Sequence, residues 1–342
     1  MSVLNAEGHT HAGQLEVHIS LNCAAGEVVA LLGPNGAGKS TTLRTLAGLN
    51  ALTAGEISID GQILDNAAST FIPTQERGIG MVFQDYVLFP HLTVRANIAF
   101  SPRARDVDAW IERMNLTDVA DRKPSMISGG QAQRCALARA LATDPRALLL
   151  DEPLAALDAS TRMAVRSELR DHLTSGSFAS VLVTHDPLDA LVLADHLIVL
   201  EHGKITQSGA TKDVAATPRT EYVASLMGVT LLRGTAAHGV FNASDGGRLV
   251  SAATQISGEA IALVRPESIS LHRTQPEGSP RNVFEVVVTE MTANLDRVRI
   301  TVAGPPTLVA TVTASAVAEL ELRVGSRVWL SLKATDVEMH AA

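Results

Sequence analysis

The chain has 342 residues, 46% of them hydrophobic and 19% charged, which is the composition of a globular protein and excludes a disordered chain. Its net charge of −8 argues against a nucleic-acid-binding surface, so we expect no nucleic-acid partner. Cys23 and Cys135 match no metal-ligand spacing and indicate a reducing compartment. No signal segment opens the chain and no run of about 18 apolar residues occurs, so we expect it not to span a membrane.

Residues 33–40 form a complete phosphate-loop motif, Gly-Pro-Asn-Gly-Ala-Gly-Lys-Ser. The apolar run Val28–Leu32 before it predicts a strand, and Thr41–Leu49 after it predicts a helix. In this context the loop N–H groups can surround phosphate oxygens, Lys39 can bind the β- and γ-phosphates, and Ser40 can coordinate Mg²⁺. We therefore expect a nucleotide to contact Gly33, Pro34, Asn35, Gly36, Ala37, Gly38, Lys39, Ser40 and Thr41.

Residues 1–230 alternate short apolar runs with longer helical patterns, which predicts an α/β domain with a mainly parallel sheet. Within it, residues 86–146 are expected to form a helical subdomain. The predicted buried strands are Val28–Leu32, Gly80–Phe83, Leu148–Asp151, Val181–Thr184 and Leu197–Leu200.

An apolar strand, Leu148–Asp151, ends in two carboxylates. At the end of a central strand Asp151 can reach Mg²⁺ directly or through water, and Glu152 can polarise the water that attacks the γ-phosphate. Such a pair alone is a weak signal, but downstream of a phosphate loop it is a strong one.

A second anion site is predicted where Ser128, Gly129, Gly130 and Gln131 open a helix that runs through Ala132–Ala142. An ordinary helix start is the alternative interpretation. One chain rarely needs two cradles for the γ-phosphate, unless the second serves the nucleotide of a partner.

Taken together, these motifs resemble the ATP-binding-cassette (ABC) ATPases, whose motif order they follow between residues 30 and 186. Ile127 replaces the leucine with which the family's signature motif usually begins. The resemblance implies that Gln84 senses Mg²⁺ and the membrane partner, that His185 contacts the γ-phosphate, and that Asp158 lies in the loop between subunits.

The resemblance also implies a homodimer. ATP and Mg²⁺ would bind between two chains, with Ser128 and Gly130 of one chain completing the phosphate cage of the other. Hydrolysis would remove the shared γ-phosphate contacts and open the dimer.

Residues 1–70 depart from the family because they contain no Phe, Tyr or Trp to stack on adenine. His11 or Leu15 would have to support the base instead. We therefore predict weak discrimination between ATP and GTP.

Residues 83–94 resemble the segment of bacterial importer ATPases that receives a transmembrane subunit. An exposed patch over 86–89 would be a docking surface, whereas Val94 and Ile98 are candidates for the core of the helical subdomain. The resemblance implies a peripheral protein on the cytoplasmic face of the cell membrane, beneath separate transmembrane permease subunits. A periplasmic or lipid-anchored oxyanion-binding protein would deliver the substrate.

From residue 231 onward the chain predicts a β-rich domain, with 231–276 as a linking β segment and 277–342 as a barrel. Leu263–His272 and Leu332–His340 weakly echo one another. Residues 277–342 resemble the OB-like mop/TOBE barrel, whose Ser-x-Arg-Asn and Lys-Ala-Thr motifs are both present. The residues suited to a tetrahedral oxyanion such as molybdate are Ser279, Arg281, Lys333 and Thr335.

We interpret the chain as the ATPase of a molybdate importer, a translocase in which Glu152 is the catalytic base, assisted by Gln84 and His185. The alternative is the same role for sulfate, tungstate, iron, a polyamine or a sugar, since importers of other substrates carry related tails. A soluble ABC ATPase outside transport is a more distant alternative.

Overall fold

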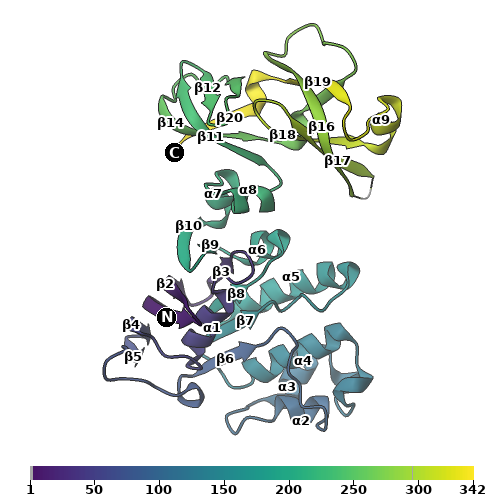
Figure 1. Ribbon diagram of the computed structural model, residues 1–342. Helices are drawn as coiled ribbons and strands as arrows, with labels where there is room; N and C mark the ends of the chain where they lie inside the picture. The colour runs from purple at the N-terminus through teal and green to yellow at the C-terminus, as the bar shows by residue number, and fades with distance from the viewer. Residues whose placement is uncertain (1–2, 295) are drawn as a thin grey trace. The chain divides into compact units, whose positions relative to one another are not determined.

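The computed structural model describes residues 3–294 and 296–342, which divide into two compact units (Figure 1). The first unit ends at Val214 and the second covers Ala215–Ala342. The helix α7 (Thr211–Ala216) crosses the boundary, and α8 (Glu221–Leu226) belongs to the second unit.

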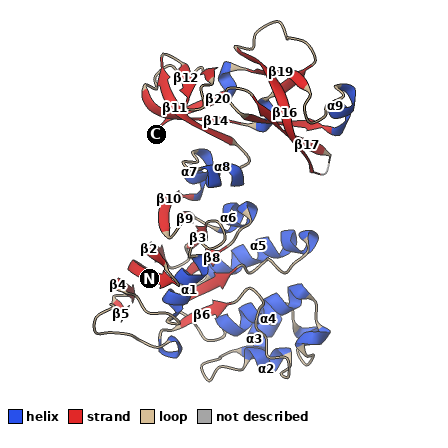
Figure 2. Cartoon of the chain, viewed as in Figure 1, coloured by secondary structure: helices blue, strands red, loops and turns tan. Residues whose placement is uncertain are grey.

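The centre of the first unit is a six-stranded sheet in the order β10-β9-β3-β8-β7-β6 (Figure 2). All neighbouring strands are parallel except β9 and β10, which confirms the predicted α/β fold with a mainly parallel sheet. Every residue of β3 and β8 is buried, as expected for central strands covered on both faces. The strands are β3 (Val28–Leu32), β6 (Ile79–Val82), β7 (Ala147–Asp151), β8 (Ala179–Val183), β9 (His196–Glu201) and β10 (Lys204–Ala210).

A second, antiparallel sheet has the order β2-β1-β4-β5. Residues of β1 and β2 alternate between buried and more exposed positions, so one face packs on the core while the other faces outward. Leu4, Ile19 and Ile57 on the buried face join Leu43 and Leu46 of α1 in one apolar cluster. The strands are β1 (Val3–Ala12), β2 (Leu15–Ala24), β4 (Ala54–Ile59) and β5 (Gln62–Asp65).

Polar side chains cap several helices of the first unit. Ser128 caps α4 with a capping box, and Thr93 caps α2 by accepting from the N–H of Ala96. Within residues 94–141, the helix α2 contacts both α3 and α4. The helices are α1 (Lys39–Ala47), α2 (Val94–Ile98), α3 (Val107–Arg113), α4 (Gly129–Leu141), α5 (Ala159–Ser175) and α6 (Pro187–Leu193), with short 3₁₀ turns at Thr74–Glu76, Thr117–Val119 and Pro124–Met126.

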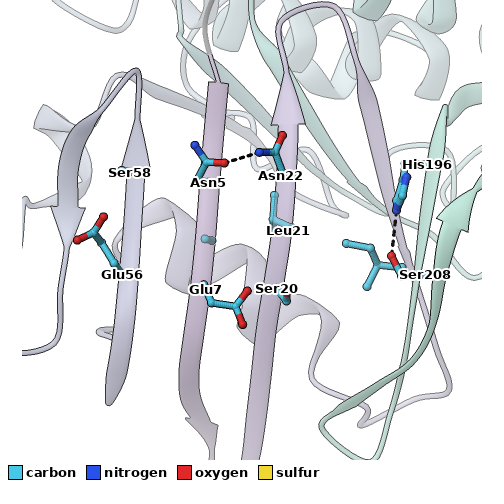
Figure 3. A pocket seen from close by; sticks show the side chains of 11 residues that line it. Asn5, Glu7, Ser20, Leu21, Asn22, Glu56, Ser58, His196 and Ser208 are labelled. Carbon is cyan, nitrogen blue, oxygen red and sulfur yellow. Dashed lines mark hydrogen bonds between the residues drawn. The ribbon is translucent and has the colours of Figure 1, made fainter.

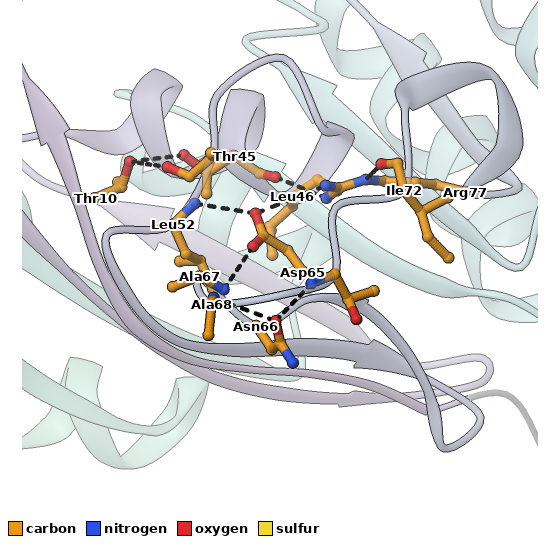
Figure 4. A network of polar contacts seen from close by, with 12 residues as sticks. Thr10, Thr45, Leu46, Leu52, Asp65, Asn66, Ala67, Ala68, Ile72 and Arg77 are labelled. Carbon is orange, nitrogen blue, oxygen red and sulfur yellow. Dashed lines mark hydrogen bonds and ion pairs between the residues drawn. The ribbon is translucent and has the colours of Figure 1, made fainter.

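A buried arginine anchors the C-terminal end of α1 (Figure 4). Arg77 is fully buried, and its guanidinium donates to the carbonyls of Thr45 (3.0 Å) and Leu46 (2.9 Å). It also pairs with Asp65 at 3.8 Å. A Cβ on Gly48 would lie 2.4 Å from Nε of Arg77, so the helix end must be glycine for the guanidinium to fit. These contacts hold the helix that carries the phosphate loop.

The second unit is built from two antiparallel five-stranded sheets, ordered β13-β12-β11-β14-β20 and β15-β19-β16-β17-β18. Phe241 and Leu249 of the first sheet share one buried cluster with Val286 and Ile300 of the second, so the sheets enclose a single core. This confirms the β-rich, OB-like second domain. The elements are β11 (Thr230–Ala237), β12 (Val240–Ala243), β13 (Arg248–Val250), β14 (Gly258–Val264), β15 (Ser270–His272), β16 (Asn282–Asn294), β17 (Arg297–Ala303), β18 (Leu308–Thr313), α9 (Ala314–Glu319), β19 (Arg327–Leu332) and β20 (Val337–Ala341).

The weak sequence echo in this unit corresponds to a structural repeat. Both copies are strand, 3₁₀ turn, strand: β14–Pro266–Ser268–β15 and β19–Ala334–Asp336–β20. The two copies pair reciprocally, β14 with β20 and β15 with β19, so each contributes one strand to each sheet. The repeat therefore joins the two sheets at two equivalent crossings.

Candidate functional site

The phosphate loop connects the C-terminal end of β3 to the N-terminus of α1, as the motif requires. A Cβ on Gly33 would lie 2.0 Å from the carbonyl oxygen of Leu200, so this position admits only glycine. Gly38, which precedes the first turn of α1, has a φ of 108° in the left-handed region. Both glycines thus shape a loop whose N–H groups and helix end suit an anion.

Lys39 is 7% exposed, and its ammonium folds back onto the loop. Nζ donates to the carbonyls of Gly33 (2.7 Å) and Pro34 (3.0 Å). Burial lowers the pKa of Lys39, while the carboxylates of Glu152 and Asp151 act in the opposite direction. A pocket of about 200 Å³ opens beside it, lined by Ala12, Asn35, Gly36, Ala37, Gly38, Lys39, Ser40, Thr41 and Glu152.

Ser40 and Asp151 meet across the end of the parallel sheet. The Ser40 hydroxyl donates to Oδ1 of Asp151 at 3.3 Å. Burial raises the pKa of Asp151, and the bond from Ser40 partly offsets this. A hydroxyl and a half-buried carboxylate beside a phosphate pocket fit Mg²⁺, which takes one or two protein oxygens together with substrate phosphates.

Glu152 follows β7 in a strained conformation, with a φ of 47°. Its N–H donates to the carbonyl of Val183 at 2.9 Å, which fixes the backbone against β8. Its Oε2 lies 3.1 Å from Nδ1 of His185. The structure thus brings the predicted base, which lines the pocket, next to the predicted γ-phosphate sensor.

The signature residues lie elsewhere on the unit. The Ser128 hydroxyl accepts from the N–H of Gln131 at 3.3 Å, and Oε1 of Gln131 accepts from the N–H of Ser128 at 2.9 Å. Ser128 and Gly129 are exposed, Gly130 is buried, and none of the three is among the described residues that line the phosphate pocket. The two predicted anion sites are therefore separate within one chain.

Sequence reasoning missed Arg162, which lies beside the loop that contains Asp158. Its guanidinium pairs with Asp186 at 3.1 Å and donates to the carbonyl of Leu157 at 3.1 Å. Asp158 itself is exposed. An arginine four positions after the Asp of this loop was visible in the sequence, but its acidic partner, Asp186, comes from a distant segment.

Gln84 follows β6, and its side chain is exposed and outside the described lining of the phosphate pocket. The segment after Gln84 contains both buried and exposed side chains. Tyr86 is 6% exposed and so is part of the core, whereas Val87 is 53% exposed. Val94 and Ile98 are fully buried, as expected for residues of the helical subdomain core.

The pairing register of β1 with β2 decides which side chains of the hairpin face the phosphate loop, where the nucleotide base would need support. Ala12 pairs with Leu15, and both pack against a cluster that includes Ala37 of the phosphate loop. His11 pairs with Glu16, on the opposite face of the hairpin. Of the two predicted supports for adenine, only Leu15 therefore lies on the side of the loop, and Ala12 is a lining residue that sequence reasoning missed.

The four oxyanion candidates, Ser279, Arg281, Lys333 and Thr335, are all exposed. The pairing of Asn282 with Leu332 places Arg281 and Lys333 side by side at the end of the β16–β19 ladder. Thr335 donates to the carboxylate of Asp336 at 3.2 Å.

The motif's asparagine, Asn282, is 2% exposed and has a structural partner. Its side-chain amide accepts from the N–H of Val250 at 2.7 Å and donates to the carbonyl of the same residue at 2.9 Å. It therefore fastens β13 to β16.

A larger pocket of about 430 Å³ lies between β1, β2 and β4 on one side and β9 and β10 on the other (Figure 3). Asn22 donates to Asn5 at 2.6 Å and His196 contacts Ser208 at 2.9 Å within it, so these polar groups satisfy one another. The predicted site residues are not among its described lining residues. Within the described part of the chain, no helix is both long and apolar enough to cross a membrane.

Comparisons with known proteins identify relatives of both units of the chain. A family model described as ABC transporter matches residues 17–155, and one described as TOBE domain matches 278–339. The molybdenum import ATP-binding protein ModC of Mycobacterium tuberculosis (strain H37Rv) is 40% identical over 364 aligned residues, which cover 100% of this chain and 98% of that protein. The sulfate/thiosulfate import ATP-binding protein CysA 1 of Chromobacterium violaceum is 41% identical over 79% of this chain and 78% of its own length.

Among solved structures, a dimeric ATP-binding cassette in a post-hydrolysis state, bound to ADP and Pi, is 31% identical. It covers 62% of this chain and 99% of its own, with a TM-score of 0.51. A bacterial Atm1-family ABC exporter with ATP bound is 29% identical over 66% of this chain and 41% of its own, with a TM-score of 0.55.

Proposed function

The chain belongs to the ABC importer ATPases, and we propose that it hydrolyses ATP to energise the uptake of molybdate through separate transmembrane subunits. One observation carries the choice of substrate. The similarity to the molybdenum importer protein extends through the whole chain, including the unit that presents Arg281 and Lys333, whereas the sulfate relative matches about four-fifths of it. The alternative substrates are sulfate, tungstate, iron, a polyamine or a sugar, and the test below distinguishes molybdate from sulfate.

The chemistry follows from the residues around the phosphate pocket. The loop N–H groups and Lys39 bind the phosphates, and Ser40 and Asp151 would hold Mg²⁺, which neutralises charge on the phosphate oxygens. Glu152 accepts the proton of the attacking water. His185, whose Nδ1 lies 3.1 Å from Oε2 of Glu152, orients that carboxylate and would contact the γ-phosphate.

We propose that the site is completed by a second copy of the chain. Ser128 and Gly130, with Gly129 between them, would contact the nucleotide held by the partner's phosphate loop; Ser128 and Gly129 are exposed at the start of α4. Asp158 and its loop adjoin this helix start, since the carbonyl of Ala156 is 3.8 Å from where a Cβ on Gly129 would be. Gln84 would sense Mg²⁺ and the permease, with the dimer peripheral on the cytoplasmic face of the membrane.

In the second unit Arg281 and Lys333 supply the charge, and Ser279 and Thr335 the hydroxyls, for a tetrahedral dianion. Occupancy of this site would rise with the cytoplasmic concentration of the oxyanion, and the bound oxyanion would slow further import. An external oxyanion-binding protein would feed the permease.

Titration calorimetry of the full chain tests the substrate class. We expect heat on adding molybdate or tungstate, less on adding sulfate, and its loss in Arg281→Ala and Lys333→Ala. Arg299→Ala, an exposed arginine of the same unit, is the matched control and should bind as the wild type does. If millimolar molybdate gives no heat, or if sulfate gives equal heat, the second unit no longer supports molybdate as the substrate.

A further inference from the structure

Arg162, on the first turns of α5, connects two loops of the candidate site. One guanidinium nitrogen contacts Asp186 at 3.1 Å, and the other donates to the carbonyls of Leu157 (3.1 Å) and Ala155 (3.5 Å). Its side chain is 24% exposed and that of Asp186 is 19% exposed, so the pair is mostly shielded from water. Charge-assisted bonds of this kind are stronger and more directional than neutral ones.

Both loops lead directly to the reacting groups. Asp186 follows His185, and its carboxylate also caps α6 by accepting from the N–H of Leu188 at 2.8 Å. In the other loop, the N–H of Ala155 donates to the carbonyl of Glu152 at 3.1 Å. Movement of Arg162 would therefore shift the neighbours of both Glu152 and His185.

Tyr86 interacts electrostatically with the same arginine. Burial raises the pKa of Tyr86, and the positive charge of Arg162 partly offsets this. Within residues 3–294 and 296–342, Oη of Tyr86 and Nε of Arg162 are both buried without a hydrogen-bond partner. Tyr86 opens the segment expected to meet the permease, and Arg139 fixes its carbonyl at 2.9 Å.

We propose that Arg162 is a positioning residue for ATP hydrolysis, which sets Glu152 and His185 relative to one another. The inference rests on the proposed ATPase function. It assigns Arg162 no contact with the nucleotide, since the pocket's described lining does not include it. Its loss should therefore lower turnover and leave ATP affinity unchanged.

The fork of the guanidinium explains why the residue is an arginine. A lysine at this position keeps the charge but has a single ammonium, which cannot hold Asp186 and the Leu157 carbonyl in a fixed plane together. Arg162→Lys is consequently the informative variant, because it preserves the charge and the helix. Arg162→Gln removes the charge and is the second variant.

The experiment measures ATP turnover, ATP binding and thermal midpoint for the full chain. Misplacing groups by about 1 Å costs up to roughly a hundredfold, so we expect kcat in Arg162→Lys to fall about tenfold or more, with the Kd for ATP within about twofold. Arg170→Lys is the matched control on the same helix. Arg170 pairs with Asp195 at 2.6 Å, and neither residue is among the described residues lining the phosphate pocket, so this variant should keep wild-type kcat.

The outcomes separate this inference from the proposed function. A wild-type chain without ATPase activity would refute the function itself. An active wild type with unchanged kcat in Arg162→Lys, or with kcat and ATP affinity falling together as in a destabilised control, would overturn the positioning role alone.

Discussion

Oε2 of Glu152 lies 3.1 Å from Nδ1 of His185, and the two side chains differ sharply in exposure, 18% for the glutamate and 56% for the histidine. The carboxylate lines the phosphate pocket and is largely shielded, whereas the imidazole beside it is mostly exposed. A base must be directed at one water, whereas a γ-phosphate sensor must meet a nucleotide that arrives from solvent. The arrangement suits these two roles.

Glu152→Gln should keep ATP binding and reduce hydrolysis, because the amide cannot accept the proton of the attacking water. Loss of a general base costs about 10²–10⁴-fold, so phosphate release should fall by that factor while binding of a fluorescent ATP analogue stays the same. Glu56→Gln, an exposed glutamate outside the phosphate pocket, is the control. Near-normal turnover in Glu152→Gln would remove the residue from this role.

Two inactive variants should restore activity when mixed, if the site is shared between two copies. Lys39→Ala disables the phosphate loop, and Ser128→Arg blocks the signature while costing about 1 kcal/mol of helix capping. A mixed dimer retains one intact composite site, so equal amounts should recover about a quarter of wild-type turnover if sites act independently. Recovery no greater than the sum of the separate variants would mean that each chain works alone.

Asp151→Asn should stabilise the nucleotide-free protein. Burial raises the pKa of Asp151, so folding disfavours its ionised form and stability falls as pH rises from the unfolded pKa through the folded one. At neutral pH the amide removes this cost, and the thermal midpoint should rise by about 2–4 °C per kcal/mol. The gain should vanish in acid, where the wild-type carboxyl is protonated. An equal gain at all pH values, or the same gain in exposed Asp118→Asn, would contradict this explanation.

The wild-type chain should bind ATP and GTP with similar affinity, because no aromatic residue within 1–70 can stack on the base. Ala12→Tyr should tighten ATP binding by roughly 1–3 kcal/mol, the usual value of one stacked base. His11→Tyr, on the opposite face of the hairpin, should have no such effect. Strong preference of the wild type for ATP over GTP would refute the prediction.

Arg77→Met should destabilise the first unit by about 3–5 kcal/mol, because it leaves the buried carboxylate of Asp65 without its cation. Urea unfolding followed by circular dichroism measures the loss. Asp65→Asn in the Arg77→Met background should recover part of it. A loss below about 1 kcal/mol would show that α1 does not depend on this anchor.

Features encoded by contiguous residues could be predicted from the sequence. The phosphate loop, the five parallel strands and the cap at Ser128 each depend on a local pattern, and the structure has the strands and the cap where the sequence indicates them. The site's remaining features depend on which distant segments meet. The cross-strand register that directs Ala12 toward the loop and His11 away cannot be deduced from either residue alone.

The same limit applies to the side chains with distant partners. Arg162 meets Asp186 across 24 positions of chain, and Asn282 fastens Val250 across 32. Tyr86 was a candidate for an exposed docking patch, yet packing places its ring in the core. Nothing in the surrounding residues distinguishes these outcomes, because the decisive contacts come from docking α5, α6 and β13 in the finished fold.

Uptake of radiolabelled molybdate into proteoliposomes tests the central claim most directly. The vesicles would contain the permease subunits, this chain and the external binding protein, with ATP enclosed. Our account predicts molybdate accumulation that requires ATP, that stops with Glu152→Gln, and that exceeds sulfate accumulation. ATP-independent accumulation, or uptake undiminished by Glu152→Gln, would contradict it.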